Sequence, residues 1–215
     1  MSIGWKFFEV KPLAMFLAIV LLVSACKQSS LEAEKESPIS NIQGKYVSKV
    51  VQDVIQFEDG TSFDFGQLNP KKAYFLVRHA EKDTVPKGDP ALTNAGALRA
   101  DKLAQILKGT RIDAIYSTFY TRTLFTAGGV SQMKGMQVKP YEERSMKEMI
   151  VGIQESAEEN RVLIVGHSNT TPVVANYIYG SDFFKSSFDD SDYDNLVLVV
   201  ESLEGKAEVF ALKFK

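Results

Sequence analysis

Reactive residues are scarce in this sequence of 215 residues, which has one cysteine, Cys26, and two histidines, His79 and His167. A single cysteine excludes an internal disulfide framework and any zinc site built from several cysteines. Two histidines would need carboxylate partners to hold a catalytic metal ion. The sequence therefore offers few ligands for a metal centre and a narrow choice of nucleophiles.

A surplus of positive charge is also missing. The chain has 25 basic and 27 acidic residues, which gives a formal net charge of −2 at pH 7. Proteins that bind nucleic acid usually have a basic surplus, so nucleic acid is not an expected partner. The apolar share of 45% and the charged share of 24% are typical of a soluble globular chain with one core of ordinary size.

The amino end lacks an apolar run long enough to span a membrane. Lys6 and Lys11 precede the apolar residues 13–23, which are well short of the roughly 20 residues that a spanning helix needs. The order of basic, apolar and then small residues is typical of a secretory signal. We therefore predict that residues 1–25 are a signal peptide and are not part of the folded domain.

The segment Val23-Ser24-Ala25-Cys26 resembles the lipobox of bacterial lipoproteins. The resemblance implies that Cys26 is acylated and becomes the new amino terminus. It also implies export to the bacterial cell envelope, with a lipid anchor in a membrane and the domain in the periplasm or outside the cell. An ordinary signal peptide, or an uncleaved anchor that contains a cysteine, is the alternative.

Residues 26–44 are polar and charged, with Pro38 and several serines. Such a composition cannot bury enough apolar surface to order itself, so we predict a flexible tether. The folded domain is then expected over residues 45–215.

Short apolar runs alternate with helical periodicity after Pro70. This alternation predicts a three-layer α/β sandwich with a largely parallel sheet and helices on both faces. The last two strands, joined across a glycine turn, are expected to form an antiparallel hairpin at the sheet edge. The expected strands of this sheet are residues 73–77, 112–116, a short one near Val138, 162–165, 196–201 and 207–214.

The first helix is expected to begin at the capping residue Thr93 and to run to about Leu107, where Lys108-Gly109 ends it. Leu98 and Leu103 are expected on its buried face. Later helices are predicted from near Thr121, around residues 146–153 and from near Pro172. Two short strands, at residues 46–50 and 54–57, are expected ahead of the parallel sheet.

Both histidines directly follow buried strands. Arg78 and His79 come after the apolar run 74–77, and His167 comes after residues 162–166. Ligands bind at the carboxyl ends of the strands in open α/β sheets. A lone histidine at such a position is most often a structural hydrogen bonder, but both histidines of the chain occupy one. We therefore predict that they face one functional site.

Four segments, in their order and spacing, resemble motifs of the histidine phosphatase superfamily, also called phosphoglycerate mutase-like. The resemblance covers Ala73 to about Tyr177, and departs from the usual first motif at Ala80 and Glu81-Lys82. The four segments are Arg78-His79, residues 92–100, Tyr116-Ser117 with Arg122-Thr123 and Thr126-Ala127, and Gly166-His167-Ser168.

The resemblance implies that His79 attacks phosphorus and carries a transient phosphoryl group, with no metal ion or cofactor. Arg78, Arg122 and His167 would then surround the phosphoryl oxygens and stabilise their charge. The two arginines would also favour the neutral imidazole that attack requires. Backbone amides at the helix start near Asn169 would add to this anion site.

Many members of the superfamily use a glutamate after the third strand to protonate the leaving group. Glu143 is the predicted proton donor, and its neighbour Glu142 is the alternative. Some relatives that act on phosphohistidine manage without this acid. Lys82 and Asn169 are candidate substrate-binding residues, although Lys82 is equally well explained as a solvated side chain.

Export and the departures in the first motif favour hydrolysis over a mutase reaction. The predicted function is therefore phosphatase activity on a small phosphomonoester. The alternatives are a catalytically silent anion-binding lipoprotein on the same fold and a phosphohistidine phosphatase. Acidic residues at 190–194 partly match a calcium loop, but the glycine of its sharp turn is missing, so an acidic loop before a strand is expected.

Overall fold

The computed structural model describes residues 1–2 and 40–215. The predicted signal peptide beyond its first two residues, Cys26 and most of the predicted tether lie outside the described residues. No helix among the described residues is long and apolar enough to cross a membrane.

A six-stranded sheet forms the centre of the domain. The first four strands in spatial order run parallel to one another. The fifth is antiparallel to the fourth, and the fifth and sixth pair antiparallel as the hairpin at the edge. The prediction of a largely parallel sheet closed by a hairpin is therefore confirmed. In spatial order the strands are β6 (Val138–Tyr141), β5 (Ala114–Thr118), β7 (Arg161–Gly166), β4 (Pro70–Arg78), β8 (Asn195–Ser202) and β9 (Ala207–Lys213).

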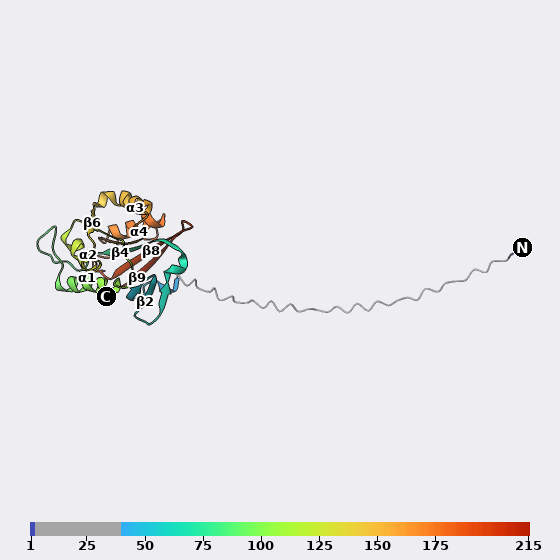
Figure 1. Cartoon of the computed structure of the whole chain (residues 1–215), viewed down its shortest axis with the longest axis horizontal. Coiled ribbons are helices and arrows are strands. Elements are labelled where there is room, and N and C mark those ends of the chain that lie inside the picture. The colour runs from blue at the N-terminus through green and yellow to red at the C-terminus, as the bar shows by residue number, and fades with distance from the viewer. Residues whose placement is uncertain (3–39) are drawn as a thin grey trace. The chain divides into compact units, whose positions relative to one another are not determined.

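Helices cover both faces of this sheet (Figure 1). Apolar residues of α1 (Asn94–Ile106) and α2 (Thr121–Lys134) pack on one face. Apolar residues of α3 (Met146–Glu155) and α4 (Thr170–Tyr179) pack on the other. The strands in the middle are buried on both sides, which explains why they read as continuous apolar runs in the sequence.

Helix α1 begins and ends close to the predicted positions. The Thr93 hydroxyl accepts a hydrogen bond from the Gly96 backbone amide and so caps the helix. The prediction that Leu98 is buried is wrong, because this side chain is 70% exposed. Leu98 lies between the positions that repeat every three to four residues toward the sheet. The buried residues of the helix are Gly96, Ala100, Leu103, Ala104 and Ile106.

A second, antiparallel sheet packs on the side of α1 and α2. It consists of β1 (Val47–Val51), β2 (Val54–Phe57) and β3 (Ser62–Asp64), and its apolar residues join the same core as those helices. Three short 3-10 helices complete the described structure. They are η1 (Ser40–Ile42), η2 (Phe65–Leu68) and η3 (Glu143–Ser145).

Residues 40–44, the end of the segment predicted to be a tether, contact this domain. Ile42 is buried in its core. The Gln43 side chain donates to the Val209 carbonyl and accepts from the Ala211 amide, both on β9. The ordered domain therefore begins ahead of Lys45.

Candidate active site

The two histidines lie side by side at the carboxyl ends of the neighbouring strands β4 and β7. Arg78 pairs with Gly166 in the parallel register, and the His79 amide donates to the Gly166 carbonyl over 2.9 Å. The centroids of the His79 and His167 rings are 5.4 Å apart. The sheet register thus brings together the two residues that the sequence places at equivalent strand ends.

His79 is held in the form that a nucleophile needs. Its side-chain Nδ1 lies 2.8 Å from the Ala80 carbonyl oxygen, which can only accept, so Nδ1 carries the proton and Nε2 keeps a free lone pair. Burial lowers the pKa of His79 to about 4, and the charges of Arg78 and Arg122 act in the same direction. The imidazole is therefore neutral at pH 7.

The loop after His79 is fixed to the start of α1. The Thr93 amide donates to the Glu81 carbonyl over 2.9 Å, and the Glu81 carboxylate binds the Arg99 guanidinium through its Nε and Nη2. Gly96 is required at this contact, because a Cβ there would lie 2.1 Å from the Glu81 carbonyl oxygen. Glu81, which departs from the family motif, thus has a structural role that sequence reasoning missed.

His167 is buried beside His79 and faces a threonine. Its Nε2 lies 2.9 Å from the Thr118 Oγ1 at the end of β5. Burial lowers the pKa of His167 to about 3, and the charge of Arg122 adds to this effect. The Tyr120 ring meets His167 edge-on, with centroids 5.0 Å apart. Neither Thr118 nor Tyr120 was singled out by its sequence pattern.

Arg78 is almost fully buried and is held by a loop from a distant part of the chain. Its Nη1 donates to the carbonyl oxygens of Asp189 and Asp192, and its Nη2 lies 3.4 Å from Asp190 Oδ1. The guanidinium also stacks on the Tyr193 ring at 4.3 Å. The acidic loop therefore positions an arginine of the site, a role that the sequence did not predict.

Arg122 comes from the first turn of α2, and its positive charge lowers the pKa of both His79 and His167. Its side chain is 13% exposed, lies 4.2 Å above the Tyr120 ring and pairs with Asp89 at its outer end. Within the described part of the chain, the Nε atoms of both Arg122 and Arg78 are buried and have no hydrogen-bond partner. Buried charged donors without partners are costly, so each of these Nε atoms is suited to an acceptor such as a bound oxyanion.

The structure distinguishes the two candidate proton donors. Glu143 Oε1 lies 3.5 Å from His167 Nε2, whereas Glu142 pairs with Arg144 at the surface. Glu143 therefore faces the histidines and Glu142 does not.

The two candidate substrate-binding residues lie at the edge of the site. Lys82 is exposed, and its charge contributes to the lowered pKa of His79. Asn169 is exposed at the amino end of α4 and makes no side-chain capping bond. Among the described residues, no group of three or more histidine, cysteine or acidic side chains is placed to hold a metal ion.

The sequence of residues 74–155, which spans three of the four segments carrying the site, matches the family model described as histidine phosphatase superfamily (branch 1). This match covers less than half of the chain. Phosphoserine phosphatase 1 of Hydrogenobacter thermophilus is 39% identical over 69 residues. This similarity covers 29% of the chain and a third, 33%, of the length of that relative.

Solved structures share the fold of this domain. The α-ribazole phosphatase of Shigella flexneri is 14% identical, with a TM-score of 0.55, over 66% of this chain and 96% of that one. A mycobacterial glucosyl-3-phosphoglycerate phosphatase is 11% identical, with a TM-score of 0.55, over 67% and 99%. The protein histidine phosphatase SixA, complexed with tungstate, is 14% identical, with a TM-score of 0.53, over 66% and 96%. Identities this low show a shared fold alone.

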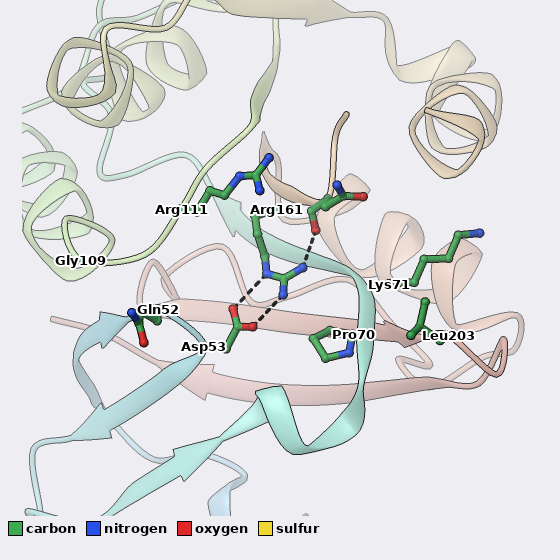
Figure 2. Close-up of a pocket in the computed structure, with 9 residues that line it drawn as sticks. Gln52, Asp53, Pro70, Lys71, Gly109, Arg111, Arg161 and Leu203 are labelled. Carbon is green, nitrogen blue, oxygen red and sulfur yellow. Dashed lines mark hydrogen bonds and ion pairs between the residues drawn. The ribbon is translucent and has the colours of Figure 1, made fainter. Parts of the chain in front are cut away.

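A hollow of about 760 Å³ lies at the opposite end of the central strands, where β4 and β7 begin. Figure 2 shows Arg161 pointing into it and binding the Asp53 carboxylate, with Nε–Oδ1 and Nη2–Oδ2 distances of 3.0 and 2.7 Å. This pair connects β7 to the turn between β1 and β2. Because Asp53 neutralises Arg161 and neither histidine lines this hollow, it is separate from the candidate active site.

Proposed function

We propose that the protein is a phosphatase that hydrolyses a small phosphomonoester through a phosphohistidine at His79. One observation carries this proposal: the two arginines whose charges act on the neutral, Nε2-free imidazole of His79 each have a buried Nε without a partner in the described structure. The relatives with the same fold include phosphatases for several phosphomonoesters, which supports the reaction but does not select a substrate.

The geometry suggests how the two halves of the reaction would run. Phosphoryl oxygens accept hydrogen bonds from Arg78 and Arg122 while His79 Nε2 attacks phosphorus. The N–P bond forms as the ester P–O bond breaks, and Glu143 gives its proton to the departing oxygen. Glu143 then takes a proton from a water molecule, which attacks phosphorus, breaks the N–P bond and releases phosphate.

Hydrolysis of 4-nitrophenyl phosphate by the purified full chain tests the proposal. We expect turnover that inorganic phosphate and tungstate inhibit competitively. Tight binding of these anions without turnover of any phosphomonoester across a pH series would instead support the silent anion-binding alternative.

Exchanging Glu143 for glutamine is expected to lower kcat/KM, which reports the step that breaks the ester P–O bond, by about 100-fold for an alkyl phosphate, the range typical of a lost general acid. The loss should be much smaller for 4-nitrophenyl phosphate, because nitrophenolate leaves without protonation. Glu142→Gln is the matched control, one residue away, and should behave like the wild type. Equal losses in the two variants, or the same loss on both substrates, would contradict the role of Glu143.

We further propose that the protein is exported and anchored in a membrane through lipid on Cys26. The proposal rests on the order of basic, apolar and small residues ahead of this cysteine. Mass spectrometry of the mature protein should find Cys26 at the amino terminus, carrying a diacylglycerol and acyl chains. The Cys26→Ser variant should lack this mass and partition into the aqueous phase of a detergent extraction. An unmodified amino terminus elsewhere in the wild type would contradict the anchor.

A further inference from the structure

A hollow of about 380 Å³ opens next to the histidines, on the side of Glu143. Thr118 and Glu143 line it, and both lie close to His167 Nε2, at 2.9 and 3.5 Å. A proton donor has to be within hydrogen-bond reach of the leaving oxygen. If the proposed function holds, the organic part of the substrate therefore extends into this hollow.

The walls of this hollow are largely aromatic. Phe119 and Tyr120 are 63% and 38% exposed, and the buried Tyr141 adds a third ring. The remaining charged side chains, Glu142 and Arg144, pair with each other. Their opposite charges offset each other, whereas exposed rings gain contact area and favourable edge or face packing from another ring.

From these walls we infer that the substrate is a phosphomonoester whose alcohol carries an aromatic ring, and that Phe119 determines this specificity. The link between β5 and α2 is only two residues long, Phe119 and Tyr120, so the strand end and the helix start fix the backbone positions of both residues. Tyr120 packs on Arg122 and His167 and belongs to the catalytic machinery. Phe119 has no such ring contact with the catalytic groups, and it lines the hollow that the alcohol would enter.

Three phosphate esters of primary alcohols test this inference: benzyl, cyclohexylmethyl and ethyl phosphate. Their alcohols differ little in acidity, so differences in kcat/KM report binding of the organic group. We expect the full chain to prefer the benzyl ester. Phe119→Ala should lower kcat/KM for that ester by about tenfold and leave the ethyl ester within about twofold of the wild type.

Phe125→Ala is the matched control, because Phe125 is 60% exposed, lies on α2 and does not line this hollow. It should leave the kcat/KM values of all three esters unchanged. If Phe119→Ala had the wild-type kcat/KM for benzyl phosphate, the inference would be overturned. An equal loss for the cyclohexylmethyl ester would overturn it too, because a merely apolar pocket would then suffice.

Calorimetry separates failure of this inference from failure of the proposed function. Benzylphosphonate and ethylphosphonate have a P–C bond that cannot be hydrolysed. The wild type should bind benzylphosphonate more tightly than ethylphosphonate, and Phe119→Ala should bind both alike. This result without any ester turnover would reject the phosphatase and keep the aromatic subsite. Equal affinities in the wild type, together with ester turnover, would reject the subsite and keep the phosphatase.

Discussion

Replacing His79 by alanine is expected to lower kcat by about 10⁴-fold or more, the scale seen when a covalent nucleophile is removed. Within residues 40–215 the other histidine is not placed to form the phosphorus bond, since His167 Nε2 already faces Thr118 and Glu143. The variant should still bind phosphate or tungstate, because Arg78 and Arg122 stay in place. The substitution should therefore lower kcat far more than it lowers the affinity for these anions.

The scarcity of histidine makes this prediction easy to check. Rapid acid-free quenching of the wild type with a ³²P-labelled ester should yield a phosphohistidine, which acid destroys and alkali spares. With two histidines in the whole chain, two peptides account for every possible position of the label. We expect label on the His79 peptide alone, and His167→Ala should still be labelled, though more slowly. Label in the His79→Ala variant would contradict the assignment of the nucleophile.

Replacing Arg122 by alanine is expected to lower kcat by about 100- to 1000-fold, as for other preorganised donors to a transition-state anion. Its buried Nε has no partner in the described structure and is available to a phosphoryl oxygen. Arg122→Lys keeps a positive charge but has no Nε donor, so it should recover only part of the lost rate. Arg144→Ala is the control, because Arg144 is largely exposed and pairs with Glu142 at the rim.

The same variant should change the pH dependence. The charge of Arg122 disfavours protonated imidazole and so contributes to the low pKa of both His79 and His167. Without it, protonation becomes easier and the pKa of each histidine rises toward 6.5. Because only neutral His79 can attack, the acid limb of kcat/KM should move from about pH 4 to higher pH. Arg122→Lys should keep this limb near its wild-type position, and an unmoved limb in Arg122→Ala would contradict this effect.

The central sheet and the position of the site followed from the sequence because both depend on local patterns. Buried parallel strands read as short apolar runs, and a change from apolar to charged residues marks the strand ends at Arg78 and His167. The Thr93 cap was recognisable from its residue type and its place before the helical pattern. By contrast, no sequence pattern shows which side of η3 faces His167. Only the structure therefore distinguishes Glu143 from Glu142 as the candidate proton donor.

Other features have no local signal in the sequence. A leucine is equally apolar at a buried and at an exposed position. Leu98 is exposed because the small residues Gly96 and Ala100 lie on the buried face of α1. Arg78 is held mainly by the backbone carbonyls of Asp189 and Asp192. Every residue has a carbonyl, so a sequence cannot reveal which ones bind an arginine more than a hundred residues away.

This long-range hold on Arg78 has a consequence for biosynthesis. The loop that carries the carbonyls is secured in turn by Lys213 on β9, which binds the carboxylates of Asp192 and Asp194. The strand ending in Arg78 pairs on both sides with strands that are synthesised later, β7 and β8. These contacts cannot form until the later strands and the loop before β8 have been synthesised. The ribosome therefore has to release nearly the whole domain before the anion pocket exists, and a shortened translation product would have its nucleophile but no oriented arginine beside it.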